Sequence, residues 1–512
     1  MNSRPVFFRI SRNRRKAASA PSMRPKALSG SIAKYSRGLA LAGSAALLAV
    51  SALLSMQSAK AADAIWNNAG TDWGTAANWT NGLPSTTQPA EFSTLTMTNQ
   101  PVIASGASVT AEGIWLNTGL GAAVTITGVT TAGTLNLTGD ATINGNATAG
   151  IVLDDSGNFG LTIGTLVTTK LTNSQTFYVN NASTLLFNGS GTLNLNGKVL
   201  TLGGTNASGI INIAQVISGT TSSLVVNTAG TVTLSNTNTF TGGATGVTLT
   251  AGVLNLNAAK ALGAAANTFA INGGTVDNTG GVAVLTNTGA ITWGGNFAYG
   301  GTNNLTIGTS AAAITNAGDR TITLNGTAKT LTFGGKMTNS EGTLQTTTVN
   351  GAGNTLSLGA YDLSNSAANY IDVITGTGNV AITGIVANGS TSTASGLTYS
   401  GTGTLTLGGA STFIGGVSLN NGTLGLGASS VVTAGALVSS PVGTGTFQVG
   451  TASQAVTLST NVINTTTRTV SNAISLNNDV TFTTSVASGR IALNVVRDAL
   501  AETRSPRPTR SL

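Results

Sequence analysis

The chain has 512 residues with no cysteine and no histidine; only 7% of the residues are charged, whereas 68 are glycine. These absences exclude a disulfide-bonded scaffold, and they remove Ser-His-Asp and Cys-His catalysis together with the commonest metal ligand. The formal net charge of +8 comes from the two ends, because residues 62–489 carry seven basic and thirteen acidic residues. A nucleic-acid-binding protein needs a basic surface on its folded part, so the sequence disfavours that class.

Residues 1–61 predict a signal peptide. A basic stretch precedes an apolar run at 38–54, and an Ala-Lys-Ala triplet that satisfies the small-x-small rule for cleavage ends at Ala61. We expect export machinery to deliver the chain and cleavage to leave Ala62 as the first residue, with no membrane span afterwards. The alternative is an uncleaved signal anchor, because 17 apolar residues are near the lower limit for crossing a bilayer. Both interpretations place the remaining chain outside the cytoplasm, at the cell surface or in the surroundings.

Residues 62–100 differ in composition from the rest of the chain and predict a small Trp-rich module. Three of the five tryptophans of the chain, Trp66, Trp73 and Trp79, lie within fourteen residues. The favoured interpretation is that the indoles pack against one another and close the end of the next region. The alternative is an exposed aromatic platform that stacks on sugars.

Residues 101–488 repeat one short pattern of alternating polar and apolar residues, with examples Thr-Leu-Asn-Leu at 134–137 and 192–195 and Thr-Leu-Thr-Leu at 404–407. Period-two alternation closed by Gly or Asn-Gly predicts a half-buried strand followed by a turn. Repetition on this scale favours a parallel β-solenoid over a sandwich. Coils of roughly 20–25 residues would give on the order of 16–19 coils.

One longer stretch occurs twice, as "TVTLSNTNTFTGG" from Thr231 and "TLTLGGASTFIGG" from Thr404. The two copies share Thr-x-Thr-Leu and then Thr-Phe-x-Gly-Gly without a gap. We interpret each copy as a strand, a corner and a return, in which phenylalanine packs and paired glycines allow the turn. The predicted corner residues are Phe240, Gly242, Gly243, Phe413, Gly415 and Gly416.

This stretch resembles the autotransporter-associated β-strand repeat of exported bacterial proteins, and the Trp-rich start resembles their leader-proximal module. The resemblance implies an all-β, right-handed parallel β-helix that the bacterium presents on its surface or releases. The chain shows neither a translocator barrel nor a C-terminal anchor pattern, so the export route stays open. Residues 489–512 form an atypical tail, with a possible amphipathic helix at 491–502. This tail is either a cap for the last coil or the product of a truncated reading frame.

Carboxylates are the remaining candidates for chemistry. Asp154 and Asp155 are the only adjacent acidic pair, and could be an acid/base pair or a weak Ca²⁺ loop. Adjacent strand residues point to opposite faces, so a polar turn is the favoured interpretation. Gly318-Asp319-Arg320 is likewise interpreted as a turn with a local ion pair.

We therefore expect an exported structural or adhesive β-helix protein without catalytic residues, cofactor or metal. Its expected partners are a surface polysaccharide or a host or neighbouring cell surface, and no nucleic acid. The alternative function is a polysaccharide-active or carbohydrate-binding β-helix protein. The enzyme would need a cleft with two or three converging carboxylates, and the binding module would need exposed indoles.

Overall fold

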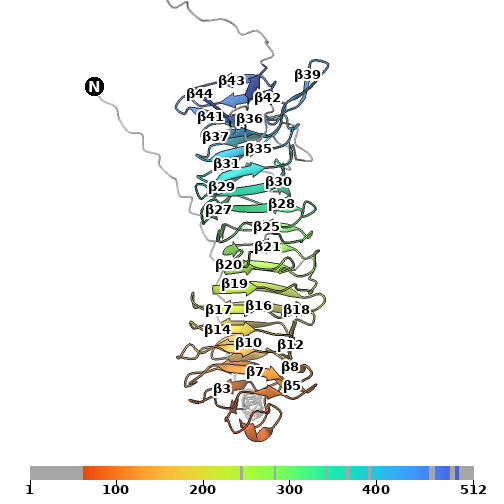
Figure 1. Cartoon of the computed structure of the whole chain (residues 1–512), viewed down its shortest axis with the longest axis vertical. Helices are drawn as coiled ribbons and strands as arrows, with labels where there is room; N and C mark the ends of the chain where they lie inside the picture. The colour runs from red at the N-terminus through yellow and green to blue at the C-terminus, as the bar shows by residue number, and fades with distance from the viewer. Residues whose placement is uncertain are drawn as a thin grey trace, which may run out of the picture. The chain divides into compact units, whose positions relative to one another are not determined.

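The computed structural model describes residues 62–242, 246–281, 284–340, 344–363, 369–389, 394–460, 467–484 and 490–494. These residues form a parallel β-solenoid of about 17 turns with almost no helix, in which successive coils stack on one another (Figure 1). The predicted fold class and number of coils are confirmed. The predicted signal peptide, including Ala61, lies outside the described residues.

Each regular coil has three sides, and parallel strands form a ladder along each side. The first side contains β1 (Ala64–Trp66), β3 (Ala90–Phe92), β6 (Ile114–Leu116), β10 (Asn146–Leu153), β13 (Gln175–Val179), β16 (Val199–Gly204), the first part of β19 (Ser223–Leu234) and of β20 (Val247–Leu256), β21 (Phe269–Ile271), β23 (Ile291–Trp293), β26 (Ile314–Asn316), the last part of β28 (Thr330–Asn339) and of β30 (Thr355–Asp362), and β33 (Val386–Ala387).

The second side continues from the first after a corner. It contains β4 (Val102–Ile103), β7 (Val124–Gly128), β11 (Leu161–Ile163), β14 (Thr184–Phe187), β17 (Ile210–Ile213), the last parts of β19 and β20, β22 (Thr275–Asp277), β24 (Phe297–Tyr299), β27 (Arg320–Leu324), β29 (Thr346–Asn350), β31 (Ile371–Thr375), β34 (Gly396–Tyr399), β36 (Val417–Leu419), β40 (Phe447–Val449) and β43 (Ile474–Leu476).

The third side closes the coil, and its strands are interrupted in the middle coils. It contains β5 (Ser108–Ala111), β8 (Gly133–Leu137), β12 (Val167–Leu171), β15 (Thr192–Asn194) and β18 (Val216–Ser218), and later β25 (Leu305–Ile307), the first parts of β28 and β30, β32 (Asn379–Ile382), β35 (Thr404–Leu407), β37 (Thr423–Leu426), β41 (Val456–Thr460) and β44 (Val480–Thr484).

The remaining elements lie outside the three ladders, at the ends of the solenoid or as hairpins that extend single coils. A 3-10 turn, η1 (Ala76–Asn78), leads into β2 (Trp79–Thr80), which pairs with β1 in the antiparallel sense. Two antiparallel hairpins extend coils: β9 (Ala141–Ile143) with β10, and β38 (Val431–Thr433) with β39 (Ala436–Ser439). Near the last coil, β42 (Thr467–Val470) pairs in parallel with β45 (Arg490–Leu493).

Alternation along each strand builds the core. In β35 the two leucines are buried and the two threonines are partly exposed, and the same pattern recurs in β8 and β32. Register pairing stacks the inward residues into continuous columns, one of which contains Leu331, Leu356, Val380, Leu405, Leu424 and Leu458. Burial of these apolar columns is the main favourable term in the stability of the stack.

Each of the two copies of the longer stretch contains a strand, and the two strands occupy different sides of the coil. Thr231–Leu234 belongs to the second side, whereas β35 belongs to the third. Phe240 and Phe413 follow on the next side in each case, and both are fully buried. Gly242, Gly415 and Gly416 line these corners, and Gly243 lies outside the described residues. Each copy thus covers a strand on one side and the start of the next side, and it is not a complete coil.

The C-terminal end differs from the expectation of a helix at 491–502, because Arg490–Leu493 is strand β45. Its sequence, Arg-Ile-Ala-Leu, does not alternate polar and apolar residues, and the strand forms by pairing along β42. Residues 495–512 lie outside the described part.

In the last coil, Phe482 pairs in register with the buried Leu458 yet is 53% exposed. Among the residues that the structure describes, no following coil covers Phe482.

Candidate binding face

The three tryptophans of the N-terminal module pack together inside the first coils. Trp79 lies edge-on to both Trp66 and Trp73, with ring centroids 4.9 Å apart in each pair, and Phe92 completes the cluster. The indoles of Trp66 and Trp79 donate hydrogen bonds to the carbonyl oxygens of Asn99 (2.9 Å) and Trp73 (2.8 Å). All three are 4% exposed or less. No indole face is open for a sugar to stack on, so this geometry gives the platform interpretation no support.

Asp154 and Asp155 follow β10 and are held by amide groups. Asp155 is 1% exposed; its Oδ2 accepts from the backbone N–H of Phe159 at 2.6 Å and its Oδ1 from the side chain of Asn181 at 2.8 Å. Asp154 accepts from Asn180 at 2.8 Å and from Asn144 at 3.0 Å. These contacts match a polar turn between coils, since both carboxylates already have amide donors.

The other acidic positions are dispersed in the same way. Asp277 accepts from the backbone and hydroxyl of Thr302, and Asp319 accepts from the backbone N–H of Thr346 at 2.7 Å. The guanidinium of Arg320 donates to backbone carbonyls, including that of Trp293 at 3.0 Å, in place of the predicted local ion pair. Within the described ranges, no group of three or more His, Cys, Asp or Glu side chains is arranged to hold a metal ion.

A buried network of polar side chains links the ends of β26, β28 and β30 to β31. The amide of Asn339 donates to the hydroxyl of Tyr361 at 2.8 Å and to the carboxylate of Asp372. Burial, and then the charge of Asp372, raise the pKa of Tyr361 well above its usual value. Both residues are enclosed, so the network specifies packing and is closed to a ligand.

The third side of the later coils carries an uncharged, hydroxyl-rich surface, which we call the hydroxyl face. Its side chains are the outward residues of β28, β30, β32, β35 and β37, which register pairing aligns in two columns. Neighbouring coils place these groups about 4.8 Å apart, and neighbouring columns are about 6.6 Å apart. The members are Thr330, Thr332, Thr355, Ser357, Asn379, Ala381, Thr404, Thr406 and Thr423.

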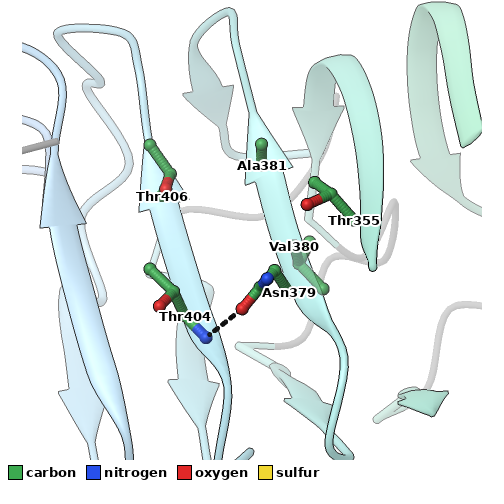
Figure 2. Close-up of a pocket in the computed structure, with 6 residues that line it drawn as sticks. All are labelled: Thr355, Asn379, Val380, Ala381, Thr404 and Thr406. Carbon is green, nitrogen blue, oxygen red and sulfur yellow. Dashed lines mark hydrogen bonds between the residues drawn. The ribbon is translucent and has the colours of Figure 1, made fainter. Parts of the chain in front are cut away.

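A hollow of about 280 Å³ opens in the hydroxyl face, lined by Thr355, Asn379, Val380, Ala381, Thr404 and Thr406. Figure 2 shows Ala381 between the Thr406 and Thr355 strands, where its methyl group leaves room that a longer side chain would fill. The Oδ1 atom of Asn379 accepts a hydrogen bond from the backbone N–H of Thr404 at 3.0 Å (Figure 2). This bond between coils fixes one wall of the hollow.

A second hollow, which we call the glycine groove, lies at the next corner of the same coils. It measures about 330 Å³ and is lined by Ser310, Gly334, Gly335, Lys336, Gly359, Ala360, Thr383 and Gly384. Gly334, Gly359 and Gly384 recur every 25 residues. A Cβ at each would lie 2.4 to 2.5 Å from a carbonyl oxygen of the preceding coil. Close stacking of the backbone therefore requires glycine here.

Sequence reasoning found the strands of these coils but missed both hollows. The corner glycines carried a usable signal, because their 25-residue spacing equals one coil. Ala381 carried none, since its importance depends on which residues are its neighbours across the coils.

Tyr399 provides a test of the buried interior. Its ring is 1% exposed, its hydroxyl has no hydrogen-bond partner among the described residues, and burial raises its pKa to about 12. The folded state therefore favours the neutral phenol, which gives stability that is present below about pH 10 and is lost as the pH rises towards 12.

We expect Tyr399→Phe to leave the free energy of unfolding at pH 7 unchanged or higher, because no hydrogen bond is lost. We also expect a smaller loss of stability between pH 10 and pH 11.5 than in the original chain. Urea unfolding followed by circular dichroism at each pH measures both. Tyr178→Phe, which alters a ring on the outer side, is the control. If both variants reduce the pH-dependent loss of unfolding free energy equally, burial of Tyr399 is not its cause.

Within the described part of the chain, no helix has the length and hydrophobicity needed to cross a membrane. Comparisons with family models, with curated proteins and with solved structures returned no match. The resemblance to the autotransporter-associated repeat therefore stays a prediction from the sequence.

Proposed function

We propose that this chain is an exported structural or adhesive β-solenoid protein that binds a surface polysaccharide or a neighbouring cell surface through its polar outer sides. The hydroxyl face carries this proposal. It offers ordered hydroxyl groups at regular intervals, and β-branched threonine is stiff, so little side-chain entropy is lost when it binds. Many weak polar contacts along such a face suit an extended partner better than a small molecule.

We further propose that the protein performs no catalysis. Asp154 and Asp155 share one turn, in which both already accept hydrogen bonds from amide groups, and Asp277 and Asp319 accept hydrogen bonds in other coils. A glycosidase requires two carboxyl groups on either side of one bond. An assay for newly formed reducing ends, on neutral and acidic polysaccharides, separates this proposal from the polysaccharide-active alternative, which release of reducing ends would favour.

Export and adhesion have one joint test. When the gene is expressed with its own leader in a bacterial host, we expect extracellular protein whose first residue is Ala62, as read by N-terminal sequencing. Ala61→Trp should block this processing, because the cleavage site needs a small residue. Purified protein should coat beads that carry extracted surface polysaccharide and leave bare beads uncoated. Retention inside the cell, or equal coating of both bead types, would contradict the proposal.

A further inference from the structure

We propose that the glycine groove is a binding site for a neutral, polyhydroxylated glycan, with the Lys336–Asp362 ion pair as its polar rim. The inference rests on the proposed adhesive function and names the ligand class and the residues that would recognise it. The groove combines two features that the packing of the solenoid does not need together: a floor without side chains and a paired donor and acceptor beside it.

The floor is accessible backbone. Gly334, Gly359 and Gly384 are stacked on consecutive coils, with Gly335 and Ala360 beside them. Because these residues project at most a methyl group, the ring of a ligand can approach the main chain closely.

The rim is an exposed ion pair. Lys336 Nζ lies 2.5 Å from Asp362 Oδ2, and the two side chains are 56% and 17% exposed. Exposed ion pairs contribute at most about 1 kcal/mol to stability, so folding alone gives little reason for one here. An ammonium group has three donors and a carboxylate accepts about four hydrogen bonds. Both groups therefore keep capacity for a ligand while they contact each other.

These groups select the ligand class. Adjacent hydroxyl groups of a sugar can accept from Lys336 and donate to Asp362 at the same time, because a hydroxyl is both donor and acceptor. Lys336 lines the groove, but its charge is already paired with Asp362. An anionic chain would therefore gain little from the ammonium group, and it would approach a body with a net charge of −6 over residues 62–489, from seven basic and thirteen acidic residues. Among the described residues, no aromatic or large apolar side chain lines the groove, so neither a nucleobase nor an acyl chain would gain a stacking or apolar surface.

The hollow in the hydroxyl face lies on the same two strands. Thr355 and Gly359 belong to β30, and Asn379 lies on β32, four residues before Thr383. Four strand residues span about 13 Å. A glycan chain that runs along these strands would therefore meet hydroxyl and amide groups at one hollow and the ion pair at the other.

Affinity electrophoresis of the purified full chain tests the proposal, with gels that contain dextran, soluble β-glucan or polygalacturonate. We expect retardation by at least one neutral glucan and none by polygalacturonate. Lys336→Ala should weaken retardation about tenfold, as expected for loss of a hydrogen bond to a charged group. Ala360→Trp should abolish it by filling the groove.

Two variants control for nonspecific effects. Lys260→Ala removes an exposed lysine on another coil and should bind like the original chain, and Lys336→Arg should retain most of the affinity. Circular dichroism shows whether each variant is folded. If Ala360→Trp does not fold, the affinity of Lys336→Ala for the glucans tests the groove by itself.

The outcomes separate the two proposals. Neutral glucans that bind equally well to Lys336→Ala, retardation by polygalacturonate alone, or no retardation in any gel would overturn the groove assignment. In each case, adhesion to polysaccharide-coated beads would leave the proposed function standing. Groove-dependent retardation without any adhesion to beads would support the site and overturn the adhesive role.

Discussion

Trp79→Ala is expected to lower the free energy of unfolding of the N-terminal coils by about 3–5 kcal/mol, the usual cost of removing a large buried aromatic side chain. Trp79 is 4% exposed and lies between Trp66 and Trp73, both at 4.9 Å. Its loss would open a cavity where the cluster closes the first coils. In a solenoid each coil contacts mainly its neighbours, so the damage should begin at this end.

Hydrogen exchange followed by mass spectrometry measures this locally. Peptides that contain β1, β3 and β6 should exchange faster in Trp79→Ala, while those of β28 to β37 should be unchanged. Leu95→Ala is the matched control in the same region, because Leu95 is 78% exposed. If these peptides are equally protected in Trp79→Ala and Leu95→Ala, the cluster does not stabilise the end of the stack.

Gly416→Ala is expected to destabilise the coils around β36 by about 2–4 kcal/mol, since backbone strain and a steric clash add. Gly416 has φ of +72°, and a Cβ at this position would lie 2.2 Å from the carbonyl oxygen of Thr446. The neighbouring coil must therefore move before any side chain fits.

Gly435→Ala separates the two causes. Gly435 has φ of +83° in the β38–β39 hairpin, but a Cβ there would have nothing within 4 Å. This control should cost only the strain of a left-handed backbone, about 1–2 kcal/mol. Chemical denaturation followed by circular dichroism compares the two. Equal losses would show that close packing of the coils at Gly416 contributes nothing.

The sequence was sufficient for the solenoid but not for the arrangement of its surfaces. Alternation in segments such as Thr404–Leu407 depends on the local pattern alone, so the strands and the number of coils were predictable. The columns of the hydroxyl face depend on coil length, which varies. Thr404 pairs with Thr423, only 19 residues on, whereas Thr423 pairs with Thr457, 34 residues on. The β38–β39 hairpin adds to the second interval.

For the C-terminal tail and for the tryptophans, too, the local sequence alone did not determine the structure. Residues 491–493 are Ile-Ala-Leu, which shows neither a helical nor a strand period, and they form a strand by pairing with β42. For Trp66, Trp73 and Trp79, composition allowed either burial or exposure. The choice depends on their position beside Phe92 at the first coils, which is a property of the stack as a whole.

The displacement of the two long repeat copies by one side has a consequence for how such a chain can change length. The strand of this unit lies on the second side at Thr231 and on the third side at Thr404, so at least these two sides can hold the same unit. Insertion or deletion of one unit would rotate every later residue by a third of a turn about the axis, and the coils would still stack. A patch of side chains could thereby be moved around the axis by a change in length alone, with its own residues unaltered.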